Sequence, residues 1–251
     1  MSRGIPFRAV LRSEWTRLRS VRSTWWCLAV YALVVLGFGW LAAAVTQEAP
    51  EPGLALAAAL TGFGFGQLVL VVLGVIVGAG EFATGSAVAS FASVPRRTRL
   101  MLAKTVVVAV VTALLSSVLA LGCFLAPRTL TYVPGGLHPG DAAVLRPLGL
   151  QVAEAALVVV LAVALGTMLR STAGGIGIGV GLALVLVVPP LLAADGRRLS
   201  RVISEALPSL RVGEDPFLAG AVSWWAGLAA VAAWAVGAWL LGAALLERRD
   251  I

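Results

Sequence analysis

Six apolar runs, each longer than 20 residues and almost free of charge, constrain this chain more than any other feature. A helix needs about 20 apolar residues to cross roughly 30 Å of hydrocarbon. Only 12% of the residues are charged, against about a quarter in ordinary globular domains. The sequence therefore predicts an all-α integral membrane protein with a single membrane domain over residues 1–251. The expected spans cover about residues 24–45, 57–80, 105–126, 147–169, 172–194 and 221–246.

The distribution of charge predicts the orientation of these spans. With both termini in the cytosol, the inner segments hold 13 of the 19 basic residues, and the outer loops hold seven of the 12 acids. An excess of Lys and Arg on the cytosolic side is the usual pattern of multi-pass membrane proteins. We therefore expect six spans with cytosolic N- and C-termini. The same bias accounts for the net charge of +7 without any nucleic-acid partner.

Residues 6–23 predict an amphipathic helix before the first span. We expect no cleavable leader, because the start is rich in arginine and the first apolar run is too long for a signal core. Apolar residues recur at helical spacing, namely Phe7, Val10, Leu11, Trp15, Leu18 and Val21. Other faces carry Arg8, Arg12, Arg19 and Arg22. This pattern favours an interfacial helix with its apolar stripe toward lipid; the alternative is that the arginines only fix the topology.

Residues 81–104, between the second and third spans, are the candidate contact with a cytosolic partner. Gly85 permits a tight turn, residues 86–93 can form a short helix that displays Val88 and Phe91, and Pro95 ends it. The basic residues of this segment are Arg96, Arg97, Arg99 and Lys104. The alternative is that Gly85 only makes a turn and the arginines only set topology. A second segment, 195–219, predicts a short outer helix that either enters the outer leaflet or lies on the surface.

Few residues within the spans could carry chemistry. Glu154 is the one charged residue expected inside the lipid, and an ionisable group there is a functional hypothesis; the alternative is a hydrogen bond to a neighbouring helix. Gln67 is a weaker candidate.

The cysteines and glycines of the spans indicate structural roles. Cys27 and Cys123 should lie at opposite faces of the membrane, so we expect no disulfide. Pairs of glycines at GxxxG spacing predict close helix packing, or occur by chance; they are Gly62 with Gly66 and Gly74 with Gly78.

Three stretches resemble the membrane subunits of type-2 ABC exporters, the ABC-2 permease family. The first is Glu81-Phe-Ala-Thr-Gly85, followed by Pro95-Arg96-Arg97-x-Arg99 and Lys104. The second is the opening SEWTRLRSVRSTWW, which is similar to the connecting helix of actinobacterial members. The third is the closing ERRDI. The scarcity of lysine, one against 18 arginines, also hints at a GC-rich bacterial genome.

The resemblance implies a permease without catalytic activity or cofactor, in a bacterial plasma membrane. Two such chains, identical or related, pair with a separate ATP-binding cassette ATPase that holds ATP and Mg²⁺; accordingly, this chain has no GxxxxGK[ST] phosphate loop. The coupling residues would be Glu81, Gly85, Val88, Phe91, Pro95, Arg96, Arg97 and Arg99. The expected cargo is hydrophobic or amphipathic, such as a drug-like natural product, as in multidrug efflux, or a lipid.

Two other functions stay open at this point. The chain could be a membrane assembly or sensor subunit that transports nothing, since the spans show few polar groups to line a path. It could also be an ion-coupled carrier that uses Glu154, although such carriers usually show a chain of ionisable groups.

Overall fold

The computed structural model describes residues 6–46, 52–83, 97–130, 138, 140–192 and 224–248, and within these ranges every regular element is an α-helix. The helices, in chain order, are α1 (Phe7–Ser20), α2 (Arg22–Val45), α3 (Pro52–Ala83), α5 (Arg97–Leu130), α6 (Ala142–Leu169), α7 (Thr172–Leu192) and α9 (Trp224–Arg248). Of the predicted segment 81–104, residues 81–83 end α3 and residues 97–104 begin α5. Residues 84–96 of this segment, and the predicted outer helix at 195–219, fall outside the described residues.

Five of these helices are long and apolar enough to cross a membrane. They cover Arg22–Val45, Ala55–Phe82, Thr98–Leu130, Val144–Leu169 and Leu228–Arg248. The all-helical fold predicted from the sequence is therefore confirmed, with five helices that could span a membrane. Where the fifth span is predicted, at about residues 172–194, the structure has α7. Its part Thr172–Ala183 is a shorter apolar helix.

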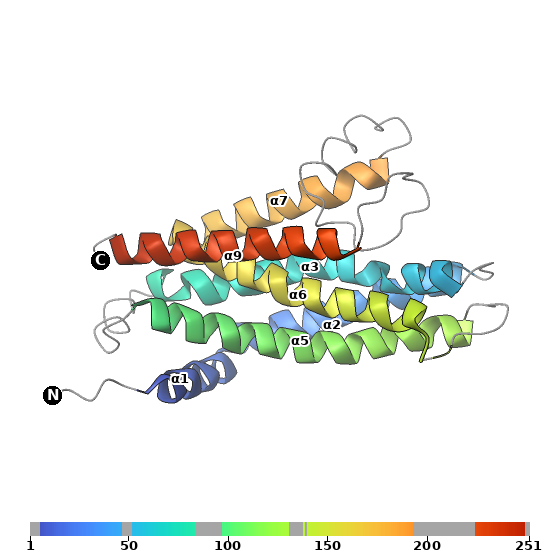
Figure 1. The fold of residues 1–251 in the computed structure, drawn as a ribbon, viewed down its shortest axis with the longest axis horizontal. Helices are drawn as coiled ribbons and strands as arrows, with labels where there is room; N and C mark the ends of the chain where they lie inside the picture. Colours follow the sequence, from blue (N-terminus) through green and yellow to red (C-terminus); the bar gives the residue numbers. More distant parts are fainter. Residues whose placement is uncertain are drawn as a thin grey trace.

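The long helices run along one common direction and form an elongated bundle (Figure 1). One end, here called the α1 end, gathers α1, the last residues of α3, the first of α5, the turn from α6 to α7 and the last residues of α9 (Figure 1). At that turn Arg170 adopts a left-handed conformation with φ 50°, and its backbone N–H donates to the carbonyl of Gly166 at 3.1 Å. This allows α7 to begin within two residues and run back along the bundle.

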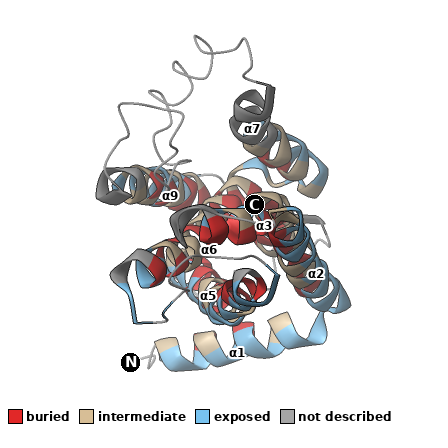
Figure 2. Ribbon diagram, turned by 90° about the vertical axis from the view of Figure 1, so that its right-hand side faces the viewer, coloured by how far each residue is buried: buried red, intermediate tan, exposed pale blue. Residues whose placement is uncertain are grey.

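Helices α3 and α6 form the centre of the bundle, where buried residues are concentrated (Figure 2). The GxxxG glycines lie at helix contacts. A Cβ added to Gly74 would meet the Cβ of Ala162 at 2.5 Å, and one added to Gly62 or Gly78 would meet a backbone carbonyl of α2 or α6. Absence of a side chain lets these backbones approach closely. Close packing at both glycine pairs is confirmed.

Helix α1 lies across the bundle rather than along it (Figure 2). Its Phe7, Val10 and Leu11 pack against Leu100 and Ala103 of α5. The amphipathic helix predicted for residues 6–23 is thus present, but the expectation that its apolar stripe faces lipid is wrong for this part. Periodicity identifies which side of a helix is apolar and does not identify what covers it, and here a neighbouring helix does.

Candidate functional site

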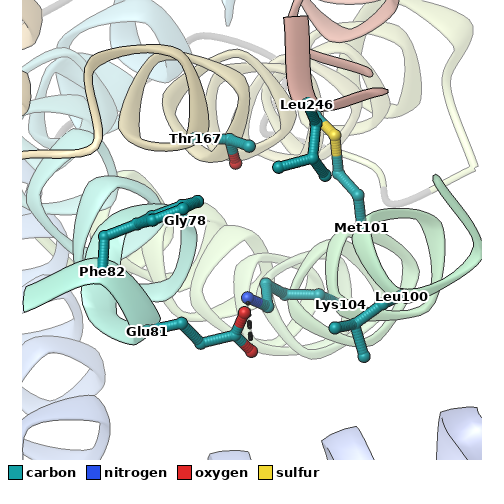
Figure 3. A pocket seen from close by; sticks show the side chains of 8 residues that line it. All are labelled: Gly78, Glu81, Phe82, Leu100, Met101, Lys104, Thr167 and Leu246. Carbon is teal, nitrogen blue, oxygen red and sulfur yellow. Dashed lines mark ion pairs between the residues drawn. The ribbon is translucent and has the colours of Figure 1, made fainter. Parts of the chain in front are cut away.

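Four charged side chains meet at the α1 end of the bundle. Lys104 Nζ on α5 lies 3.0 Å from Glu81 Oε1 at the end of α3, a pair visible in Figure 3. The guanidinium of Arg17 on α1 donates to the same oxygen of Glu81, and it lies 3.9 Å from Glu14 Oε1. We call Glu14, Arg17, Glu81 and Lys104 the ion cluster.

The ion cluster is buried except at one edge. Glu81 is 1% exposed, Lys104 6% and Glu14 8%, whereas the Arg17 side chain retains 38% of its accessible surface. Burying an unpaired charge costs several kcal/mol, on the order of a whole domain's net stability. Two acids and two bases cancel formally, so the cluster can be buried without a net charge.

The sequence explains how α1 contributes to the cluster. Glu14 lies one turn beyond Val10 and one turn before Leu18, so helical spacing places it within the apolar stripe that packs on the bundle. Arg17 follows three residues later and reaches toward α3 from the edge of that stripe. An acid in the middle of an apolar stripe is the signal that could have identified the site, and sequence reasoning gave Glu14 and Arg17 no role.

The other two members stand on either side of one connection. Glu81 is two residues from the end of α3, and Lys104 is two turns into α5, which begins at Arg97. The chain between the two helices, residues 84–96, is the middle part of the segment 81–104 that is predicted to contact a partner. The ion cluster therefore joins the two helices that flank this segment and attaches α1 to both.

Burial changes the charge balance of one acid of the cluster, Glu14. Loss of solvent raises the pKa of Glu14, and the neighbouring Lys104 and Arg17 only partly offset this, while the nearby Glu81 carboxylate adds to it. Glu14 is thus the acid of the cluster that burial drives toward its protonated form.

A small pocket adjoins the cluster between α3, α5, α6 and α9. Its lining comprises Gly78, Glu81, Phe82, Leu100, Met101, Lys104, Thr167 and Leu246 (Figure 3). Its volume of about 10 Å³ accommodates roughly one water molecule. Among the described residues no group of three His, Cys, Asp or Glu side chains could hold a metal ion. The site is therefore suited to linking helices through charge, and the pocket is far too small for a cargo molecule.

The structure separates the residues predicted for coupling. Glu81 is buried in the cluster, while Arg99 is exposed on the first turn of α5. Arg97 begins α5. The remaining candidates, Gly85, Val88, Phe91, Pro95 and Arg96, lie outside the described residues. All five residues predicted for the interfacial helix are exposed: Arg8, Arg12, Trp15, Arg19 and Arg22.

A second polar contact lies deeper in the bundle. Gln67 Nε2 on α3 donates to Glu154 Oε1 on α6 at 2.8 Å, and Glu154 is 5% exposed. A hydrogen bond also joins α2 to α5, where the hydroxyls of Tyr31 and Ser116 lie 2.8 Å apart. Of the two expectations for Glu154, the hydrogen bond to a neighbouring helix is the one observed. Cys27 and Cys123 are both free, as expected.

Comparison with known proteins adds no relative. No protein-family model matches the chain, and no curated protein matches it. The similarity to type-2 exporter permeases accordingly rests on the sequence motifs given above.

Proposed function

We propose that the chain is the membrane-spanning permease subunit of an ATP-binding cassette exporter. In this proposal six spans cross a bacterial plasma membrane, with α7 as the fifth and both termini in the cytosol. A second permease chain completes the path, and a separate ATPase binds ATP and Mg²⁺. The cargo is hydrophobic or amphipathic, such as a drug-like natural product or a lipid.

The ion cluster is the observation that carries this proposal. A subunit driven by an external ATPase must transmit movement from a cytosolic contact to several spanning helices together. Glu81 and Lys104 join the helices on both sides of the 84–96 connection at 3.0 Å, and Arg17 attaches α1 to the same carboxylate. Displacement of the connection would thus move α1, α3 and α5 as one unit.

The burial of Glu81 assigns it a positioning role in this proposal. A side chain that is 1% exposed and shared between two cations is held by its own chain. Contact with the ATPase would fall to two residues at the start of α5, Arg97 and the exposed Arg99. It would also involve residues of the connection that the sequence motif identifies, Val88, Phe91 and Arg96.

A membrane assembly or sensor subunit is the second candidate. The observation that favours it is the pairing of buried polar groups with each other, Gln67 with Glu154 and Tyr31 with Ser116, which leaves them turned toward partners within the bundle. Such a subunit needs the same membrane helices but no ATPase whose rate responds to cargo.

The first experiment is purification of the tagged chain from gently solubilised native membranes, followed by identification of what accompanies it. We expect a soluble protein that contains a phosphate loop and hydrolyses ATP. Arg96→Glu with Arg97→Glu should abolish this association, because both charges belong to the proposed contact. Arg128→Glu is the control, since Arg128 lies at the opposite end of α5.

Each outcome decides between the two candidates. Loss of the ATPase in the double variant, with retention in the control, supports the exporter. Recovery of the chain without any ATP-hydrolysing protein contradicts it and favours the assembly or sensor subunit. Stimulation of the associated ATPase by an added hydrophobic compound would exclude that second candidate.

A further inference from the structure

Helix α1 has an exposed side in addition to the one that packs on α5. Arg8, Arg12, Trp15 and Arg19 are all exposed, and they follow one another at steps of four, three and four residues. In a helix spanning Phe7–Ser20 this spacing places them in a single row along one flank. We call these four residues the arginine row.

Helices α1 and α2, over residues 6–46, have no exposed acid that would offset the charge of this row. Glu14 is the one acid between residues 6 and 46, and it is buried in the ion cluster. Within the described part of the chain, none of the three arginines of the row forms an ion pair. Their charge therefore faces outward, toward whatever surrounds the α1 end of the bundle.

Tryptophans mark the surroundings of the row. Trp15 is 44% exposed and Trp26, at the start of α2, is 72% exposed. The guanidinium carbon of Arg19 lies 6.0 Å from the centre of the Trp15 ring, and Trp25 Nε1 donates to the Arg19 carbonyl at 3.0 Å. Exposed tryptophans at the end of a spanning helix are typical of the membrane–water boundary, which sets the arginine row at the depth of lipid headgroups.

We propose that the arginine row is a binding surface for anionic phospholipid headgroups. Guanidinium groups match the geometry of phosphate oxygens, and basic side chains next to an anionic leaflet attract it over about a Debye length. The apolar stripe cannot serve as the main lipid contact of α1, because α5 covers Phe7, Val10 and Leu11. The surface follows from the described helices alone and does not depend on whether the chain transports a cargo.

The test uses the full chain in non-ionic detergent with equal amounts of phosphatidylglycerol and phosphatidylcholine that carry identical acyl chains. Native mass spectrometry then counts the lipids retained. We expect phosphatidylglycerol to be enriched on the order of five-fold or more, as one engaged basic residue alone would provide. Arg8→Gln, Arg12→Gln and Arg19→Gln combined should bring the ratio close to one, and about 1 M salt should reduce it in the unsubstituted chain.

Two variants make the test specific. Arg128→Gln, Arg197→Gln and Arg198→Gln combined remove the same charge elsewhere in the sequence and should leave the enrichment intact. Arg8→Lys, Arg12→Lys and Arg19→Lys combined keep the charge and should retain most of it. Helical circular dichroism and gel filtration verify that each variant is folded.

Persistent enrichment in the triple Gln variant would overturn the proposal, and so would an equal loss in the distant control. If the arginine row binds an acidic protein instead of lipid, the triple Gln variant should retain the lipid enrichment of the unsubstituted chain. Failure of this test would leave the ATPase experiment unaffected, since neither measurement uses the other's readout.

Discussion

At the scale of single residues, one oxygen of Glu81 is shared by two cations. Lys104 approaches it at 3.0 Å, and Arg17 donates to it from α1. Removal of either cation leaves the carboxylate with the other. Removal of the carboxylate leaves both cations facing each other, with Lys104 almost fully buried.

Because both cations depend on one carboxylate, we expect the loss of Glu81 to destabilise the fold more than the loss of Lys104. Glu81→Gln keeps the side-chain volume and should lower the free energy of unfolding by about 3–5 kcal/mol, the cost of leaving a buried charge without its partner. Lys104→Met should cost less, because Arg17 still pairs with Glu81. Denaturation in detergent followed by circular dichroism measures both, with exposed Arg99→Gln as the control. An equal or larger loss in Lys104→Met would contradict the shared-oxygen arrangement.

Glu14 predicts a pH dependence with a definite sign. Burial raises its pKa in the folded chain above the ordinary 4.5, so the folded state binds this proton more tightly than the unfolded state does. The unfavourable contribution of Glu14 is therefore absent below the ordinary value and grows as pH rises through the raised pKa. The other charges that face Glu14 are those of Arg17, Lys104 and Glu81.

The measurement is the stability of the unsubstituted chain and of Glu14→Gln from mildly acidic to neutral pH. The difference between them should shift in favour of the Gln variant as pH rises, because Gln never carries the buried charge. Glu247→Gln, at an exposed position of α9, should run parallel to the unsubstituted chain. A difference that is constant with pH would rule out titration of Glu14 in this range.

Sequence reasoning reached two of the four members of the ion cluster, Glu81 and Lys104, and missed Glu14 and Arg17. The motif around residues 81–104 identified Glu81, but it assigned this residue to a cytosolic contact, and the structure buries it. The positions of Arg17 and Glu14 depend on how α1 crosses the bundle, a tertiary arrangement that no local pattern encodes. The sequence does show that an acid, Glu14, lies within the apolar stripe of α1. This position is the sign, at the level of single residues, that α1 has a protein neighbour.

At the scale of elements, glycines determine how closely α3 approaches its neighbours. A Cβ at Gly62 would meet the backbone of Val35 and Gly39 on α2, whereas one at Gly64, two residues along the same helix, would meet nothing within 4 Å. Backbone atoms cannot rotate aside as a flexible side chain can. The two positions therefore form a matched pair on one helix.

Gly62→Ala should lower the free energy of unfolding by about 1–3 kcal/mol, because it forces α2 and α3 apart. Gly64→Ala should be neutral or stabilising by up to about 1 kcal/mol, since alanine is the better helix former. Thermal unfolding in detergent distinguishes them. A similar effect in both variants would show that helix propensity, rather than the approach of the two backbones, dominates at Gly62.

The existence of the helices could be predicted well, and their contacts only in part. Length and apolarity identify a spanning helix because the bilayer imposes both. They do not fix its ends: α5 begins at Arg97, eight residues before the predicted third span, because a helix continues through polar residues beyond the hydrocarbon. GxxxG spacing predicted close packing of α3 but not which helix it packs against. In the structure Gly62 lies against α2, and Gly74 lies against α6.

At the scale of the whole molecule, the described helices form a bundle whose two ends differ in character. Figure 1 shows α1 at the same end as the last residues of α3 and the first of α5. The ion cluster joins these three helices, and this end also has the exposed arginines of α1 and the short turn at Arg170. The charge bias of the sequence predicted that these segments share one side. Which side of a membrane this is depends on the bilayer and the insertion machinery, neither of which is part of the fold.

The ion cluster also orders events in time during synthesis. Arg17 leaves the ribosome 64 residues before Glu81 and 87 residues before Lys104. At about 5–20 residues per second these separations correspond to roughly 3–13 s and roughly 4–17 s. Until α3 and α5 have both been made, Glu14 and Arg17 have no buried counterparts with which to pair. Docking of α1 is therefore one of the later steps of assembly, although α1 is made before α3 and α5. It requires that the hairpin of α3 and α5 has already formed.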